Sequence, residues 1–193
     1  MAVRVLALDL MDTVLRDPFR EALEAATGRE LAELFARRDP EVYPAFERGE
    51  LDEVTYWGHY AAAGITVDPA AFHRVRRAGT HFLPGMAELL DDLAGRVERV
   101  TASNYPVWIE QVARDHLTGR IERVLASCHL GARKPDEVFY TRLLDAVGAE
   151  AHEVLFVDDR TENVEAARDV GIDAHHFTDA GALRRWLAGR GVG

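Results

Sequence analysis

The sequence predicts an α/β fold: a three-layer, Rossmann-like parallel sheet with helices on both faces, plus a small all-helical unit inserted after the first strand. In the second half of the chain, short β-branched or leucine-rich runs alternate with segments of helical periodicity, which is the pattern of a parallel sheet. Between the first such run and the second, every periodic segment is helical and none resembles a strand. These two observations define the fold class.

The expected strands are short, apolar runs that begin with VRVLALD at residues 3–9. The later ones are 97–103, 121–127, 153–159 and a shorter candidate at 172–177. Helical segments at 85–95, 107–117, 136–148 and 161–171 lie between them. Gly148 and Gly171 stand at the ends of two of these helices, where a left-handed C-terminal cap falls.

Residues 16–83 interrupt this alternation. Helical patterns cover 19–28, 30–38, 51–64 and 69–79. We therefore expect a core domain made of residues 1–15 and 84–193, and a helical insert made of residues 16–83.

Composition narrows the class of protein. At 193 residues and 48% hydrophobic content, the chain can bury one good core with a small appended unit. A net charge of −10, with acids spread along the chain, offers no basic face, so we expect no nucleic-acid partner. No apolar run approaches the roughly 18 residues of a membrane helix, and Asp9 comes too early for the core of a secretory signal. With Cys128 as the single cysteine, we expect a cytoplasmic protein without a membrane partner, of open oligomeric state.

Polar side chains collect where the predicted strands end. In a doubly wound sheet, ligands bind beyond the carboxyl ends of the strands. The residues delivered there are Asp9 from the first strand, Ser103 and Asn104 from the second, Lys134 after the third, and Asp158 and Asp159 from the fourth. Each alone has an ordinary interpretation as a helix cap or turn residue. Their coincidence at four strand ends favours a functional site.

Lys134 adds independent weight, because it is the only lysine among the 23 basic residues. A compact ammonium suits a phosphate oxygen or a neighbouring carboxylate where a planar guanidinium does not fit. Its position next to Pro135, before a predicted helix, places it at the same edge of the sheet.

In order and spacing, these motifs resemble those of the haloacid dehalogenase-like (HAD) hydrolase superfamily, and the likeness covers nearly the whole chain. The matching stretches are DLMDTV at 9–14, SN at 103–104, Lys134 within GARKPDEVF, and VDDRTENVEAARDVGI at 157–172. The helical insert resembles the small cap that many members carry, and FERGELDEVTYW is typical of such caps. Within the superfamily, the chain looks closest to the sugar-phosphatase and epoxide-hydrolase N-domain branch.

The resemblance implies an Mg²⁺-dependent phosphatase, a phosphoric monoester hydrolase, acting on a small phosphorylated metabolite. Asp9 would be the nucleophile that forms an aspartyl-phosphate. Mg²⁺ would bind Asp9, the backbone carbonyl of Met11 and Asp158, and Asp159 would complete the shell through water.

The remaining roles that the resemblance implies concern the phosphoryl group. Ser103 and the backbone amides near Met11 and Asn104 would bind its oxygens, while Lys134 would offset charge on the nucleophile and on the transferring group. Asn163 would anchor the loop after the fourth strand.

Position 11 departs from the family pattern. Members usually place a second Asp two residues after the nucleophile, where it protonates the leaving oxygen and later activates water. Met11 occupies this place, and Asp12 follows it where glycine is more common. General acid-base help is typically worth roughly 10²–10⁴-fold. Either Asp12 supplies the proton, although a loop residue one place along usually points elsewhere, or the leaving group is acidic enough to need none.

Two other functions stay open. A catalytically weakened HAD-like protein could bind a phosphorylated ligand or partner, and Met11 supports that hypothesis. A haloacid dehalogenase needs no metal and would not want the acidic pair of Asp158 and Asp159. As candidates for facing a substrate, the cap offers Glu47, Arg48, Tyr56, Trp57 and His59. The ordinary interpretation of each is a core or surface residue of the cap.

Overall fold

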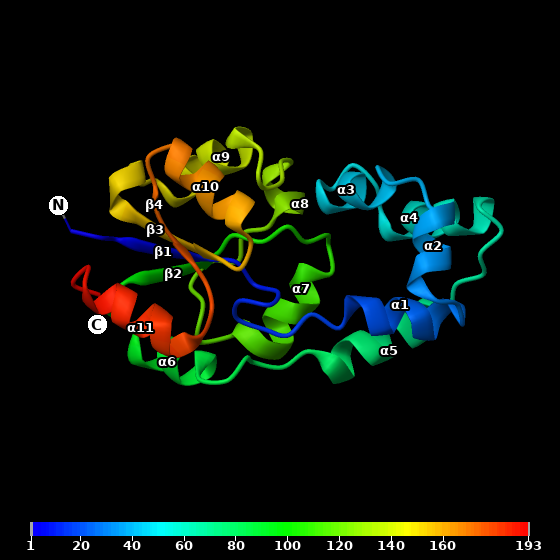
Figure 1. Ribbon diagram of the computed structural model, residues 1–193, viewed down its shortest axis with the longest axis horizontal. Helices are drawn as coiled ribbons and strands as arrows, with labels where there is room; N and C mark the ends of the chain where they lie inside the picture. The colour runs from blue at the N-terminus through cyan, green and yellow to red at the C-terminus, as the bar shows by residue number, and fades with distance from the viewer. Residues whose placement is uncertain (1, 193) are drawn as a thin grey trace.

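A computed structural model of the chain, in which residues 2–192 are described, has a parallel sheet at its centre (Figure 1). The strand order is β2-β1-β3-β4. The strands are β1 (Val5–Leu8), β2 (Glu98–Thr101), β3 (Val154–Asp158) and β4 (Asp173–His176). In register, Leu8 pairs with Thr101 on one side and with Val157 on the other, so the carboxyl ends of three strands lie level. The predicted fold class is confirmed.

Alternate residues of the central strand pack against two different layers of helices. Val5 and Ala7 belong to a cluster with α9 (Glu137–Val147) and α10 (Thr161–Asp169). Leu6 and Leu8 face the layer of α6 (Met86–Asp92) and α11 (Ala180–Ala188). Figure 1 shows the two layers on opposite sides of the sheet. Burial on both faces explains why β1 and β3 are continuous apolar runs rather than alternating ones.

The expected strand at 121–127 is wrong. This segment runs beside β2 and meets it only in isolated bridges, Val100 with Arg123 and Ser103 with Ala126. The Leu125 amide donates to the hydroxyl of Thr101 at 2.8 Å, and that hydroxyl contacts the Leu125 carbonyl at the same distance. Because a side chain takes the amide that a strand would donate to its neighbour's backbone, the ladder is interrupted. A short helix, α8 (Ser127–Leu130), then follows.

The predicted helices form, most of them with shorter bounds than their sequence patterns. The segment 107–117 forms α7 (Ile109–Val112) and continues as a π-helical turn, Ala113–Leu117. A 3₁₀ turn, Ala151–Glu153, precedes β3. The final helix, α11, was not among the predicted segments.

The insert after β1 is helical throughout its regular elements. They are α1 (Phe19–Thr27), α2 (Leu31–Arg37), α3 (Val42–Glu47), α4 (Glu53–Ala62) and α5 (Pro69–Gly79). The sequence patterns did not predict α3. Asp52 and Asp68 cap α4 and α5 by accepting backbone amides of Thr55 and Ala71.

Cap and core share one hydrophobic cluster. The ring of Trp108, next to α7, packs against Phe46, Trp57 and Phe72 of the cap at centroid distances of 4.7–5.7 Å. The exact division of the chain into domains at residues 16 and 83 therefore stays a prediction. No helix within residues 2–192 combines the length and apolar character needed to cross a membrane.

Candidate active site

The predicted polar residues converge at the carboxyl edge of the sheet, around a cavity of about 330 Å³. Its lining includes Asp9, Met11, Asp12, Ser103, Asn104, Lys134, Asp158 and Asp159. A larger hollow of about 840 Å³ lies between α5 and α7 and shares no lining residue with this cavity. The smaller cavity is the candidate site because it holds the buried acids and the lone lysine.

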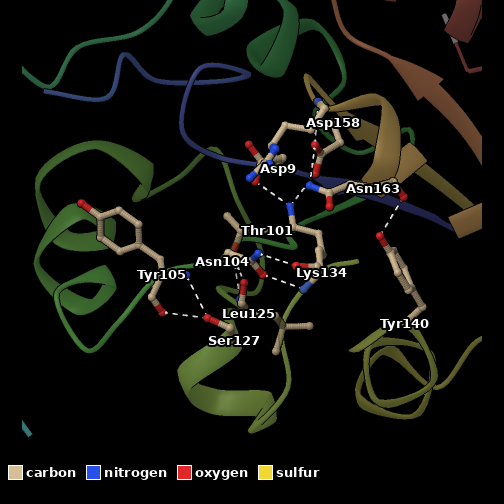
Figure 2. Close-up of polar contacts among 11 residues, drawn as sticks. Asp9, Thr101, Asn104, Tyr105, Leu125, Ser127, Lys134, Tyr140, Asp158 and Asn163 are labelled. Atoms are coloured by element: carbon tan, nitrogen blue, oxygen red, sulfur yellow. Dashed lines mark hydrogen bonds and ion pairs between the residues drawn. The ribbon is translucent and has the colours of Figure 1, made fainter. Parts of the chain in front are cut away.

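At the bottom of the cavity, the Lys134 ammonium lies between two carboxylates. Its Nζ is 2.6 Å from Asp9 Oδ1 and 2.5 Å from Asp158 Oδ2 (Figure 2). The three residues are 2%, 7% and 0% exposed, in the order Lys134, Asp9 and Asp158. Buried charges are tolerated only when they are paired and hydrogen-bonded, and this group satisfies that requirement.

Burial and charge act on the acid-base behaviour of this group in opposite directions. Burial raises the pKa of Asp9 to about 7, Lys134 works against that rise, and the charges of Asp158 and Asp159 add to it. Burial alone would lower the pKa of Lys134, but the two carboxylates outweigh it and the net shift is upward. The site therefore holds more carboxylate than one ammonium neutralises, and added positive charge would stabilise it.

Asn104 fixes the backbone of Lys134. Its side-chain amide donates to the Lys134 carbonyl at 2.9 Å and accepts the Lys134 amide at 2.8 Å. Figure 2 shows this pair of bonds beneath the ammonium group. The predicted Ser-Asn pair thus contributes one residue, Asn104, that positions the lysine, while Ser103 lies buried in the cavity lining.

The loop after β3 holds the second carboxylate. Asp158 Oδ1 accepts hydrogen bonds from the Arg160 amide and from Asn163 Nδ2, both at 2.9 Å. The Asn163 carbonyl in turn accepts the Tyr140 hydroxyl at 2.7 Å. Asn163 therefore contacts the carboxylate at the end of β3 and the hydroxyl of Tyr140 on α9, and its role as the anchor of the loop stays a prediction. Asp159 is half-buried, and burial together with Asp158 raises its pKa.

The loop after β1 presents Met11 to the cavity and turns sharply at Asp12. Asp12 has a φ of 59°, in the left-handed region, and its amide donates to the Leu15 carbonyl. Its carboxylate is exposed and accepts the Asp17 amide at 3.1 Å. Asp12 lies in the cavity lining, and one of its carboxylate oxygens is already bonded to the Asp17 amide. Its role as the proton donor stays a prediction.

The donor set fits a hard divalent cation. Within residues 2–192, no three Asp, Glu, His or Cys side chains gather closely enough to hold a metal ion between them. The predicted set needs only two side chains as direct ligands, Asp9 and Asp158, with the Met11 carbonyl, while Asp159 would complete the shell through water. All of these ligands are oxygens, which Mg²⁺ prefers, and Mg²⁺ usually keeps several waters.

The structure also brings to the cavity Arg133, which the sequence did not indicate, and pairs it with the cap candidate Glu47. Glu47 at the end of α3 accepts Arg133 Nε at 2.9 Å and Nη2 at 2.6 Å through Oε2. Ser127 donates from its hydroxyl to the Glu47 carbonyl at 2.6 Å. Burial raises the pKa of Glu47 to about 7 in spite of the Arg133 charge. Asp17 also lines the cavity, and the sequence did not indicate this carboxyl group.

Of the cap residues predicted to face a substrate, Glu47 alone lines this cavity. Arg48 pairs with Glu50 at 2.6 Å, and His59 is exposed away from the lining. Tyr56 and Trp57 stack in the aromatic cluster of the cap. For these four residues, the ordinary structural interpretation is the one the geometry favours.

The fold and the cavity define an α/β protein with a helical insert and an acid-lysine-acid group at the strand ends. The chain belongs to the haloacid dehalogenase-like hydrolase family, whose model matches residues 3–171. It is 32% identical over 190 residues to flavin mononucleotide hydrolase 1 of Arabidopsis thaliana, a chloroplast protein, covering 97% of this chain and 78% of that one. It is 32% identical over 146 residues to a sesquiterpene phosphatase of Aspergillus oryzae, covering 72% and 74%.

Among solved structures, a HAD-family enzyme from Bacteroides thetaiotaomicron has the same fold. Its TM-score is 0.81 at 16% identity, over 96% of this chain and 100% of that one. Another crystal structure of that enzyme contains magnesium and inorganic phosphate and superposes with a TM-score of 0.78, over 94% and 99% of the two chains at 16% identity.

Proposed function

We propose that this protein is an Mg²⁺-dependent phosphatase that hydrolyses a small phosphorylated metabolite through an aspartyl-phosphate on Asp9. The observation that carries the proposal is the buried contact of Lys134 with both Asp9 and Asp158 at the carboxyl edge of the sheet. Two relatives at 32% identity are named as a flavin mononucleotide hydrolase and a sesquiterpene phosphatase, and these names support phosphoester chemistry. The bacterial enzyme of the same fold binds magnesium and phosphate.

Asp9 is the residue placed to attack phosphorus. In the first step a carboxylate oxygen of Asp9 forms a bond to phosphorus as the bond to the leaving oxygen breaks. The leaving oxygen takes a proton and departs as an alcohol. Water then attacks the phosphorus of the phospho-Asp9, which releases inorganic phosphate and restores the carboxylate.

The surrounding residues stabilise charge during both steps. Lys134 lies close enough to Asp9 to contact the oxygens of the transferring group, where a fixed ammonium needs no reorganisation. Ser103 and the amides at the strand ends bind phosphoryl oxygens. Mg²⁺, held by Asp9, the Met11 carbonyl and Asp158, would neutralise the excess carboxylate charge when bound.

Met11 favours one alternative, the weakened member that binds a phosphorylated ligand without turning it over. Its side chain lines the cavity where other members present a carboxylate. Retained acids, a retained lysine and enzymatic relatives weigh against this alternative.

The test is a substrate screen with p-nitrophenyl phosphate, sugar phosphates, flavin mononucleotide and other nucleotides, each with Mg²⁺ and with EDTA. We expect turnover that EDTA abolishes and that Asp9→Asn reduces by at least about 10³-fold. Asp9→Asn should also lose any acid-stable phosphoenzyme trapped from the parent, while its circular dichroism stays that of the parent.

Two results would replace the proposal. Metal-independent release of halide from 2-haloacids would assign the protein to the dehalogenases. Binding of phosphate esters without turnover of any of them would assign it to the weakened binders.

A further inference from the structure

The cavity contains a carboxyl group that can take the place of the acid missing at position 11. Asp17 lies in the segment that leads from the β1 loop into α1, and it lines the same cavity as Asp9 and Lys134. We propose that Asp17 is the general acid-base of this enzyme, delivering the proton to the leaving oxygen and later accepting one from water. This assignment rests on the proposed phosphatase function.

The hydrogen bonds of Asp17 leave one carboxyl oxygen available. Oδ1 accepts the Phe19 amide at 2.9 Å at the start of α1. The structure gives Oδ2 no hydrogen-bond partner within residues 2–192. The backbone of Asp17 is fixed in turn, because its amide donates to Asp12 Oδ1 at 3.1 Å. Two hydrogen bonds, one to Oδ1 and one from the backbone amide, therefore hold the residue that carries the free Oδ2.

Its surroundings keep this carboxyl group protonated closer to neutrality than an ordinary Asp. Burial raises the pKa of Asp17 to about 6, the nearby charges of Asp12 and Glu21 add to the rise, and the Phe19 amide and Arg16 oppose it. A general acid works best when its pKa lies near the working pH.

From the other elements packed around it, the groups that face Asp17 are aromatic. Tyr43 of α3 and Tyr105 after β2 both interact with its charge, and burial raises the pKa of each phenol, so both stay neutral over the working range. Among the cations of the cavity, Arg133 pairs with Glu47, Arg160 with Glu162, and Lys134 with Asp9 and Asp158. Arg20 on α1 also lines the cavity and has no ion pair within residues 2–192.

Asp17 gives up one proton in the first step and regains one in the second. As the bond from phosphorus to the leaving oxygen breaks, the electron pair goes to that oxygen and the Asp17 proton converts it to a hydroxyl. The Asp17 carboxylate then accepts a proton from the water that attacks phosphorus. The bond between phosphorus and Asp9 breaks, phosphate leaves, and Asp17 is again protonated.

Asp12 is the competing candidate, and its geometry is less suitable. Its side chain is exposed, and its Oδ1 is bonded to the Asp17 backbone. The Asp12 side chain lies in contact with water, whereas Asp17 is half-buried.

A purely structural role for Asp17, as the acceptor of the Phe19 amide at the start of α1, is separable by experiment. Asp17→Asn retains an oxygen that can accept the Phe19 amide and removes only the acid. The matched control is Asp68→Asn, in which an Asp caps α5 through the Ala71 amide at 3.1 Å and lies outside the cavity lining. If Asp17→Asn does not fold, Asp17→Ser takes its place in the same measurement, because the serine hydroxyl can also accept a backbone amide.

The measurement is kcat/KM for p-nitrophenyl phosphate and for glycerol phosphate between pH 5 and 8, with Mg²⁺ present. Glycerol phosphate has a poor leaving group and needs the proton, whereas p-nitrophenolate needs little help. We expect Asp17→Asn to lower the glycerol-to-aryl ratio of kcat/KM by roughly 10–100-fold. In the parent, the glycerol-to-aryl ratio of kcat/KM should fall as pH rises above about 6, and this fall should vanish in Asp17→Asn. The ratio is the quantity to follow because ionisation of the nucleophile Asp9 affects both substrates.

The other outcomes separate the two proposals. A parent that hydrolyses phosphate esters, with an Asp17→Asn ratio within about threefold of the parent's, would overturn the role of Asp17 and leave the phosphatase standing. A drop of the ratio in Asp12→Asn instead would transfer the role to Asp12. A parent inert on every ester would overturn the phosphatase and this assignment with it. If Asp68→Asn lowers the glycerol-to-aryl ratio of kcat/KM as much as Asp17→Asn does, the effect comes from the lost contact at a helix start and not from the acid.

Discussion

The side-chain amide of Asn104 bonds to both backbone polar groups of Lys134, at 2.9 Å to its carbonyl and 2.8 Å to its amide. The two residues are 30 positions apart, so the end of β2 determines where the ammonium lies relative to β1 and β3. A lysine side chain is a flexible four-carbon stem, so its backbone must be fixed if the ammonium is to stay between two carboxylates.

Removing this amide should loosen the lysine. Asn104→Ala leaves two half-buried backbone groups without their partner, which costs about 1–3 kcal/mol of unfolding free energy. Asn104→Asp keeps an acceptor for the Lys134 amide but sets a carboxylate oxygen against the Lys134 carbonyl, so we expect a similar loss. Urea unfolding and kcat measured together check both variants. Parental stability and turnover in Asn104→Ala would show that the strand end alone positions the lysine.

Lys134 itself should not be replaceable by arginine. The side chain is buried between Asp9 and Asp158, and a guanidinium is larger and planar, so Lys134→Arg must displace one carboxylate. We expect kcat to fall by about 10²-fold or more. Lys134→Met, which leaves two buried carboxylates unpaired, should lose about 3–5 kcal/mol of unfolding free energy. A fully active Lys134→Arg enzyme would show that the site does not require lysine at position 134.

The sequence predicted those site residues that a local pattern and a topological rule locate together. Asp9, Ser103 and Asp158 end recognisable strands, and parallel strands deliver their ends to one edge of the sheet. The strand expected at 121–127 failed because its apolar, β-branched pattern contains no sign that the Thr101 hydroxyl would take the Leu125 amide. Tertiary context overrode the propensity there.

The sequence missed the pairing of Glu47 with Arg133 and the place of Asp17 in the cavity, because both depend on contacts that no local pattern contains. Glu47 and Arg133 are 86 positions apart and belong to cap and core, so only the folded chain brings them together. Asp17 stands directly before Pro18 and a helix, which in a sequence indicates a helix start and nothing more. Its place in the cavity depends on the turn at Asp12, an unusual positive-φ residue that is not glycine.

The docking of α3 on the core predicts a difference between two glycines of the cap. Gly49 and Gly64 have nearly equal φ angles of +74° and +72°, so replacement by alanine causes similar backbone strain at each position. A Cβ at position 49 would lie 2.9 Å from the Cys128 carbonyl oxygen, whereas at position 64 no atom lies within 4 Å. Gly49→Ala should therefore be less stable than Gly64→Ala by about 1–3 kcal/mol in urea unfolding. Equal stabilities of the two variants would mean that α3 and α8 can move apart at this contact at little cost in free energy.

The pair of Glu47 and Arg133 predicts a pH dependence of stability. Burial raises the pKa of Glu47 from 4.5 to about 7, so the folded state binds this proton more tightly than the unfolded state does. The stability that comes from the proton is fully present below about pH 4.5 and is lost as pH rises through about 7. The unfolding free energy of the parent should thus fall across that window relative to Glu47→Gln, which does not titrate, with a slope of at most about 1.4 kcal/mol per pH unit.

Taking the difference between parent and Glu47→Gln isolates this one group, because Asp9 and the other shifted acids titrate in both proteins and largely cancel. Glu50→Gln is the matched control, since Glu50 lies three residues on, also pairs with an arginine, Arg48, and is exposed. The measurement is urea unfolding of all three proteins at half-unit steps from pH 4 to 8. If the parent instead gains stability over Glu47→Gln as pH rises, the Arg133 ion pair outweighs burial, and the carboxylate, not the acid, is the form that holds α3 on the core.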